Sequence, residues 1–264
     1  MGESARQAGA GFSEFVRLIA VLRGPDGCPW DRAQDHTSLR RTMIEEAYEA
    51  VSAIESGDDA LLAEELGDVL LQVVLHAQIA SDDGRFTIDE VIAGISDKIS
   101  RRHPHVFGDA EAGTSAEVIE RWDALKRAER EGDRVLDGIP QSLPALLWAH
   151  KISRRAVGAG FEWGSLDEVW EKVHEEIDEL KETEPGSAEA AGEIGDLLFT
   201  IVNLARKQGI DAEEALRATC RKFIGRFEQM ERDAAAAGRG VADLDISEME
   251  ALWRLAKERE GHES

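Results

Sequence analysis

An all-α fold of two tandem helical domains, each built on a carboxylate-bearing helical hairpin, is predicted by three features of the sequence. Apolar residues recur at the helical spacing of three and four through most of the chain. No run alternates polar and apolar residues for long enough to indicate a strand. The helical pattern also begins again after a polar, glycine-bearing stretch at 131–142, which we interpret as a linker between domains at 12–130 and 143–259.

The helices of the first domain are expected to be separated by segments rich in glycine, proline and serine. They are predicted at Phe12–Leu22, Ser38–Ile54, Asp59–Ala80, Ile88–Arg102 and Ser115–Arg130. Ser13 and Thr87 are the expected N-caps of the first and fourth helices, because a hydroxyl at that position accepts a hydrogen bond from an unpaired backbone N–H. His103 and His105 flank Pro104, which we interpret as a structural turn rather than a metal site.

The second domain repeats this arrangement. Its helices are predicted at Leu143–Val157, Ser165–Lys181, Ala188–Lys207, Asp211–Ala236 and Ser247–Arg259. The break at Pro185-Gly186-Ser187 makes the second and third of these a helical hairpin, since this tripeptide favours a tight turn.

Carboxylates gather on the two arms of that second hairpin. Glu176 and Glu179 share one face of the first arm, and Glu193 and Asp196 share one face of the second, because residues three or four apart are neighbours on a helix. Converging beside the apolar run at 197–202, these charges would repel strongly without a cation among them. The implied occupant is a hard divalent metal ion.

The same set of residues occurs in both halves, at offsets of roughly 130 residues. The first half contains Glu46, Glu49, Glu65, Asp68, Lys98, Arg102, Trp122 and Lys126. Their counterparts in the second half are Glu176, Glu179, Glu193, Asp196, Lys222, Arg226, Trp253 and Lys257. Acidic residues can hold Mg²⁺, Lys and Arg can hold phosphate oxygens, and Trp can stack on a base. The combination indicates a metal-dependent site for a nucleoside polyphosphate, although such tryptophans more often anchor a core or an interface.

Composition limits the partners of the chain. Charged residues make up 32% and the hydrophobic set 42%, which is typical of a globular protein. A net charge of -23 and a pI near 4.7 argue against nucleic acid and anionic membranes as partners. The two cysteines, Cys28 and Cys220, have no disulfide or metal spacing, and Cys28 is expected to pack within its loop. With no apolar signal core and no apolar run long enough for a bilayer, a cytoplasmic location is expected.

Several motifs together resemble the MazG family of all-α nucleoside triphosphate pyrophosphohydrolases, over nearly the whole chain. They are Gly27-Cys28-Pro29-Trp30-Asp31, Glu45-Glu46-x-x-Glu49 with Glu65-x-x-Asp68, Arg101-Arg102-His103-Pro104-His105-Val106-Phe107, Leu143-Pro144-Ala145-Leu146, Gly160-Phe161-Glu162-Trp163, and the second hairpin. The resemblance implies hydrolysis of NTPs or dNTPs to the monophosphate and pyrophosphate with Mg²⁺, or alternatively Mn²⁺. It also implies a homodimer of helical bundles that serves nucleotide-pool housecleaning.

The resemblance assigns roles residue by residue. It implies metal binding by Glu176, Glu179, Glu193 and Asp196, and nucleotide contacts from Lys172, Glu175, Lys222, Arg226, Trp253 and Lys257. Glu175 is also the candidate to orient or deprotonate the attacking water. In this family the C-terminal copy is usually the active one. Here the N-terminal copy keeps its counterparts, so a second site is proposed at Glu45, Glu46, Glu49, Glu65, Asp68, Lys98, Arg102, Trp122 and Lys126. One departure is Gly192, where the family often has the acidic residue that Glu64 supplies in the first copy.

Two other classes of protein were weighed. A di-iron carboxylate bundle needs Glu-x-x-His on two helices, whereas only Glu171-x-x-His174 occurs here. A non-catalytic helical scaffold or regulatory nucleotide-binding protein stays open, particularly for the N-terminal half. Hydrolysis that is lost with EDTA and restored by Mg²⁺ would separate the enzyme from the scaffold, and absorbance from bound iron would indicate the bundle oxidase.

Overall fold

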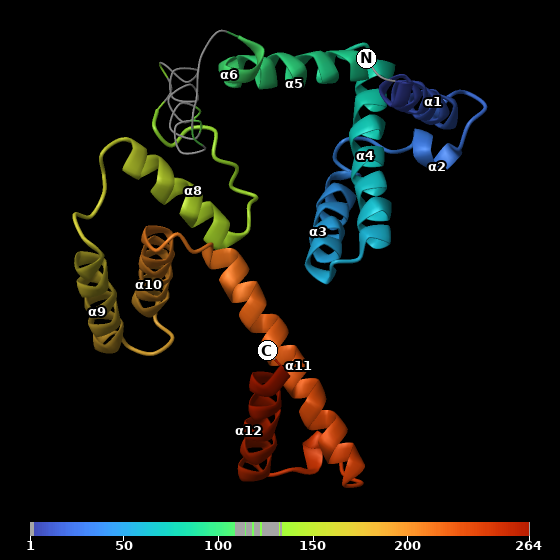
Figure 1. Cartoon of the computed structure of the whole chain (residues 1–264). Helices are drawn as coiled ribbons and strands as arrows, with labels where there is room; N and C mark the ends of the chain where they lie inside the picture. The colour runs from blue at the N-terminus through green and yellow to red at the C-terminus, as the bar shows by residue number, and fades with distance from the viewer. Residues whose placement is uncertain are drawn as a thin grey trace. The chain divides into compact units, whose positions relative to one another are not determined.

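Every element in the described part of the chain is a helix, as the sequence predicts. The computed structural model describes residues 3–108, 114, 118, 122, 132 and 134–263, and no strand occurs among them. The helix expected at 115–130 therefore lies, apart from two residues, outside the described part. The chain divides into two compact units, Met1–Glu131 and Gly132–Ser264, and each is considered separately (Figure 1).

The first unit is organised around a hairpin of two helices. The helices in its described part are α1 (Glu3–Arg23), α2 (Pro29–Arg32), α3 (Arg40–Ser56), α4 (Asp59–Asp82), α5 (Ile88–Arg102) and α6 (Pro104–Phe107). The turn between α3 and α4 needs Gly57, whose φ of 70° is in the left-handed region. The next residue, Asp58, caps α4 by accepting hydrogen bonds from the backbone N–H groups of Ala60 and Leu61. This turn fixes α3 against α4 along their length (Figure 1).

The two predicted N-caps of this unit had different outcomes. Thr87 caps α5 in a capping box, in which its backbone N–H donates to the Glu90 carboxylate at 2.8 Å. Ser13 is not a cap, because α1 begins ten residues earlier, at Glu3. The Ser13 hydroxyl instead donates to the backbone carbonyl of Gly9 at 2.9 Å, a bond typical of serine inside a helix. That correction lengthens α1, which packs against α4 over the buried Ile19.

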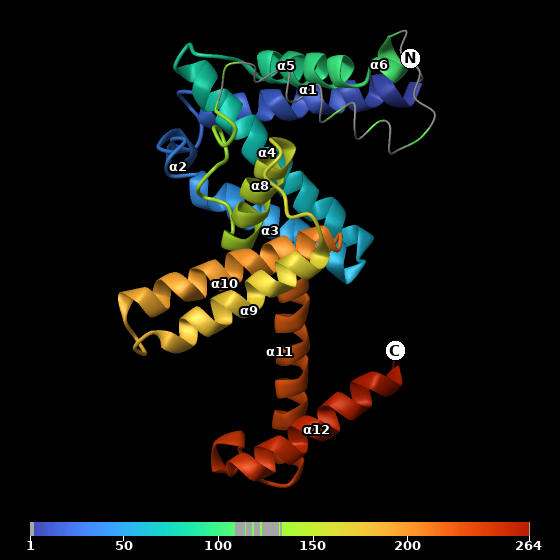
Figure 2. The ribbon, with the colours of Figure 1, turned by 90° about the vertical axis from the view of Figure 1, so that its left-hand side faces the viewer.

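The second unit contains a matching hairpin and a long additional helix. Its elements are α8 (Ala145–Gly158), α9 (Leu166–Glu182), α10 (Ala188–Lys207), α11 (Ala212–Ala236), the 3-10 turn η1 (Val241–Asp243) and α12 (Ile246–Glu263). Ser165 and Ser187 cap α9 and α10, and Gly186, with φ of 80°, forms the turn between them. The two helices lie side by side in both views (Figures 1 and 2). Their core is formed by Val169, Val173 and Leu204.

A buried polar network joins α8 to α10. The Ser153 hydroxyl donates to the side-chain oxygen of Asn203 and accepts from Arg206 Nε at 2.8 Å. Arg206 also donates to the Glu162 carboxylate at 2.8 Å, which lowers the pKa of Glu162 below its ordinary value. Glu162 belongs to the Gly160-Phe161-Glu162-Trp163 motif. In this chain the motif therefore holds the loop before α9 on the end of α10.

Helices α11 and α12 form an arm of the second unit. The arm is attached where α11 packs against α8 and α10, and α12 turns back and packs against α11 (Figure 1). None of the helices in the described part of the chain combines the length and apolar character that crossing a bilayer requires.

Candidate active site

Carboxylate oxygens from both helices of the second hairpin, α9 and α10, converge. One oxygen each from Glu176, Glu193 and Asp196 lies within 4.8 Å of the others. Glu176 is 4% exposed, so its carboxylate is held in a setting where an uncompensated charge is costly. The three residues come from α9 and α10, which the turn at Gly186 brings together.

Glu179, the fourth predicted ligand, lies at the edge of this group. It is exposed and is not among the oxygens that meet within 4.8 Å. Desolvation raises its pKa, Lys172 opposes that rise, and the neighbouring carboxylate of Glu193 adds to it. The charge of the cluster therefore affects the pKa of Glu179, although no Glu179 oxygen belongs to the group of close oxygens.

Lys172 supplies the positive charge next to the cluster. Its ammonium lies 2.9 Å from one oxygen of Glu175 and 2.9 Å from one oxygen of Glu176. These hydrogen bonds, first that to Glu176, raise the pKa of Lys172 well above its ordinary value, so the ammonium stays charged. The sequence analysis placed Lys172 among nucleotide contacts and missed this pairing. The signal was present, because Glu175 and Glu176 follow Lys172 at the helical spacings of three and four.

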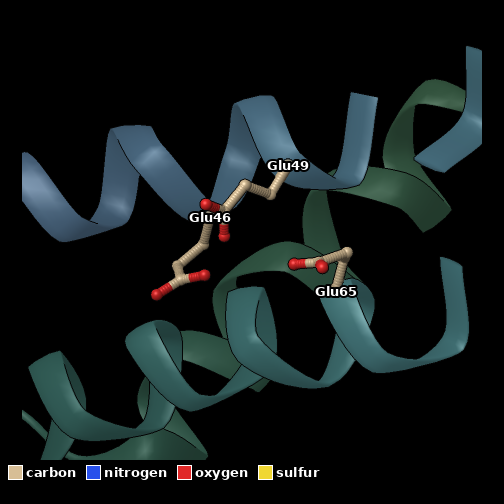
Figure 3. A group of neighbouring side chains, drawn as sticks. All are labelled: Glu46, Glu49 and Glu65. Atoms are coloured by element: carbon tan, nitrogen blue, oxygen red, sulfur yellow. The ribbon is translucent and has the colours of Figure 1, made fainter. Parts of the chain in front are cut away.

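The first hairpin presents a comparable cluster. One oxygen each from Glu46, Glu49 and Glu65 lies within 4.8 Å of the others, and these side chains extend between α3 and α4 (Figure 3). Desolvation, followed by Asp68 and Glu49, raises the pKa of Glu46. Desolvation and Glu49 likewise raise the pKa of Glu65. The fourth predicted ligand here, Asp68, adds its charge without entering the group of close oxygens.

The first cluster differs from the second in its cationic neighbour. Thr42 stands one helical turn before Glu46, the position that Lys172 has relative to Glu176. The Arg41 guanidinium does not pair with Glu46. Its Nε lies 2.6 Å from Oε1 of Glu45, and both of these side chains are exposed. The like charges of Glu46 and Glu49 are therefore not neutralised from this position of the helix.

The predicted basic and aromatic contacts of the second copy lie on α11 and α12. Arg226 donates from Nε to Glu260 at 2.7 Å, and its guanidinium carbon lies 5.6 Å from the centre of the Trp253 ring. Trp253 also contacts Phe223, with ring centroids 4.9 Å apart. Lys222 and Lys257 are exposed on the same arm. Within one chain these residues therefore belong to α11 and α12, whereas the carboxylate cluster belongs to α9 and α10.

The corresponding residues of the first copy are only partly described. Lys98 is exposed on α5, and Arg102 is half-buried at the end of that helix. The Trp122 ring lies 5.3 Å from that of His103 in an edge-on contact, so His103 has a packing role here. Lys126 lies outside the described residues.

The donor set of both clusters suits a hard divalent cation. All the converging atoms are carboxylate oxygens, which Mg²⁺ and Mn²⁺ prefer over nitrogen or sulfur ligands. In the second cluster the Lys172 ammonium lies 2.9 Å from a Glu176 oxygen. A positive charge is therefore already bound to one of the clustered carboxylates. Fold and site together define an all-α protein whose tandem hairpins each present a carboxylate cluster fitted to such a cation.

Comparisons with known proteins place the chain within a family. The sequence model described as the MazG nucleotide pyrophosphohydrolase domain matches residues 34–107 and 165–230, which contain both hairpins. The chain is 44% identical over 260 residues to the nucleoside triphosphate pyrophosphohydrolase of Escherichia coli K12, covering 94% of this chain and 99% of that protein. It is 44% identical over 252 residues to the nucleoside triphosphate pyrophosphohydrolase/pyrophosphatase MazG of Thermotoga maritima, covering 96% and 98%.

A more distant relative agrees with these. The nucleoside triphosphate pyrophosphohydrolase of Mycobacterium tuberculosis is 34% identical over 246 residues, covering 91% of this chain and 65% of that protein. The chain therefore belongs to the MazG nucleotide pyrophosphohydrolase family, which is a family of enzymes.

Proposed function

We propose that this protein hydrolyses nucleoside triphosphates, ribo- or deoxyribo-, to the monophosphate and pyrophosphate, with Mg²⁺ or Mn²⁺ bound at the α9–α10 hairpin. The observation that carries the proposal is the convergence of Glu176, Glu193 and Asp196 oxygens within 4.8 Å. It is supported by the relatives reported above, which are named nucleoside triphosphate pyrophosphohydrolases.

The side chains of the hairpin have distinct roles in this proposal. Glu176, Glu193 and Asp196 would hold the metal ion, and Glu179 would add negative charge at the edge of the site. When bound, the ion supplies Lewis-acid chemistry, lowering the pKa of a bound water and stabilising charge on the leaving phosphate. Glu175, the residue before Glu176, would orient the attacking water or accept its proton.

Lys222, Arg226, Trp253 and Lys257 are the proposed contacts for the triphosphate and base. Because they lie on the α11–α12 arm, we propose that the enzyme is a homodimer, in which a second copy brings such an arm to the hairpin. Apolar side chains exposed on α9, α10 and α11 support association, since burial of apolar surface between two copies is favourable. Those most exposed include Trp170, Ile194, Leu198, Phe223 and Ile224. Light scattering of the purified chain measures the expected doubled mass.

The biological setting we propose is housecleaning of the cytoplasmic nucleotide pool. Nucleoside triphosphates are the proposed partners, and the net charge of -23 disfavours nucleic acid as a competing polyanion. The metal would offset that same repulsion for a free triphosphate.

Product identification is the experiment that tests the proposed function. A panel of NTPs and dNTPs should give the monophosphate and pyrophosphate in equal amounts with Mg²⁺, and nothing with EDTA until Mg²⁺ is restored. Stepwise release of inorganic phosphate would instead indicate a phosphatase. Failure to consume any triphosphate with Mg²⁺ or Mn²⁺ would contradict the proposal and favour a non-catalytic nucleotide-binding protein.

A further inference from the structure

Lys172 occupies an unusual place for a surface lysine. Its ammonium bonds both Glu175 and Glu176 at 2.9 Å, and these partners differ strongly in exposure. The Glu176 side chain is 5% exposed and belongs to the carboxylate cluster, whereas the Glu175 side chain is 55% exposed and does not. Lys172 thus links a buried cluster carboxylate to a solvent-facing one.

The bond between Lys172 and Glu176 would be weakened by a divalent ion bound at the same carboxylate. A divalent ion among Glu176, Glu193 and Asp196 would share the carboxylate of Glu176 with the ammonium. Like charges that close together repel strongly where solvent screening is weak, and Glu176 is in such a place. The bond to Glu175 does not suffer this conflict to the same degree, because that carboxylate lies in solvent.

We propose that Lys172 is an internal counter-cation of the C-terminal site, competing with the divalent ion for Glu176 and released from it when the ion binds. Glu175 then keeps the ammonium beside the site, where it meets the triphosphate. Metal binding and triphosphate binding are thereby coupled through one side chain. The coupling to nucleotide rests on the proposed function, whereas the competition with metal does not.

The first hairpin offers a natural comparison. Thr42 replaces the lysine there, so Glu46 has no ammonium bound from one turn earlier. The cluster of Glu46, Glu49 and Glu65 is otherwise composed in the same way, of carboxylate oxygens within 4.8 Å. The proposal therefore requires the N-terminal cluster to bind a divalent ion more tightly than the C-terminal one.

The test is Mn²⁺ binding to the full-length protein without nucleotide, followed by electron paramagnetic resonance of the free ion. The C-terminal site is isolated in a Glu46→Gln, Glu65→Gln background, and Lys172→Met is compared with Lys172→Arg. Lys172→Met should tighten Mn²⁺ binding about tenfold, since a competing unit charge is removed, while Lys172→Arg, which keeps the charge, should change it less than about twofold. In a Glu176→Gln background, Thr42→Lys should weaken the N-terminal site about tenfold.

Unchanged or weaker Mn²⁺ binding by Lys172→Met, with circular dichroism like that of the parent, would overturn the proposal, because a lysine that merely orders α9 cannot oppose the metal. A second readout separates competition from simple stabilisation. With Mg²⁺ saturating, Lys172→Met should raise the KM for the triphosphate although it binds metal better. Since the Mn²⁺ titration contains no nucleotide, its outcome does not depend on the hydrolysis that tests the proposed function.

Discussion

The two carboxylate hairpins have the same kinds of candidate ligand residues, but they differ in the residue one helical turn before the first ligand. Each gathers oxygens within 4.8 Å from two antiparallel helices, but a lysine stands beside the second cluster and a threonine beside the first. In the first hairpin the mutual repulsion appears as raised pKa values of Glu46 and Glu65. In the second, desolvation raises the pKa of Glu179 and Lys172 opposes that rise. Matching ligand residues therefore do not make matching sites, because the neighbouring charge sets how strongly a metal is held.

The largest expected difference between the hairpins is in catalysis. Glu176→Gln should lower kcat/KM about a thousandfold, because a metal contributes several kcal/mol of charge stabilisation and each decade corresponds to about 1.4 kcal/mol. The matched Glu46→Gln should lower it less than about threefold if, as proposed, the C-terminal copy is the principal catalyst. Pyrophosphate release measures both, and Glu182→Gln, an exposed change on the same helix as Glu176, is the control. Equal losses in the two variants would contradict the assignment of catalysis to the second hairpin.

The next largest difference is expected in substrate affinity, between the lysines of α11 and α5. Lys222→Ala is expected to raise the KM about tenfold with kcat little changed, since a charge-assisted hydrogen bond to phosphate contributes about 1.5–3 kcal/mol. Its counterpart Lys98→Ala in the first unit should have a smaller effect. Steady-state kinetics over a range of triphosphate concentrations resolves the two constants. An unchanged KM for Lys222→Ala would remove Lys222 from the phosphate site.

The helices that carry these lysines also differ in backbone stability. Gly225 lies inside α11, where Arg101 stands at the same position of α5, and an added methyl group there would meet no atom within 4 Å. Gly225→Ala should raise the free energy of unfolding by about 1 kcal/mol, because alanine is the better helix former. Gly209→Ala is the contrasting control, since φ of 71° there should make the same change destabilising. Denaturant titration measures both, and a loss of stability in Gly225→Ala would show an unseen requirement for glycine.

The smallest expected effect concerns the repulsion in the first hairpin. Without metal, Glu46→Gln should be more stable than wild type at neutral pH by about 0.5 kcal/mol, since one member of a like-charge group is removed. The pKa of Glu46 is raised in the folded state, so the repulsion is fully present above that pKa and absent below the unfolded value of 4.5. The advantage of the variant should therefore shrink as the pH falls toward 4.5.

Magnesium supplies the control for that measurement. With Mg²⁺, wild type should become the more stable protein, because an ion that binds only the folded state stabilises it. Thermal unfolding of both proteins with EDTA and with Mg²⁺ decides the matter. A stability difference between wild type and Glu46→Gln that grows on acidification, or that does not change with Mg²⁺, would contradict a metal site at Glu46.

Local sequence signals predicted the hairpins well. Ser165 and Ser187 cap the helices that carry the second cluster, and spacing of three or four residues put the carboxylates of each helix on one face. Choices made by tertiary packing were beyond these signals. The spacing alone could not show that Glu179 and Asp68 stay at the edge of their clusters, because this depends on how far each helix is rotated against its partner.

Other outcomes depended on competition between partners. Ser13 has a hydroxyl suited to a cap, but α1 already begins at Glu3, so the hydroxyl bonds the Gly9 carbonyl instead. Arg226 was predicted to hold phosphate, and the structure shows it paired with Glu260 against Trp253. No pattern within α11 could reveal that partner, because Glu260 comes from another helix.

A crystal structure with Mn²⁺ and a non-hydrolysable triphosphate is the most direct test of the central claim. The anomalous signal of Mn²⁺ should lie about 2 Å from oxygens of Glu176, Glu193 and Asp196, with the Lys172 ammonium turned from Glu176 toward a phosphate. A Mn²⁺ ion bound away from the α9–α10 hairpin, with these carboxylates facing only water, would contradict it.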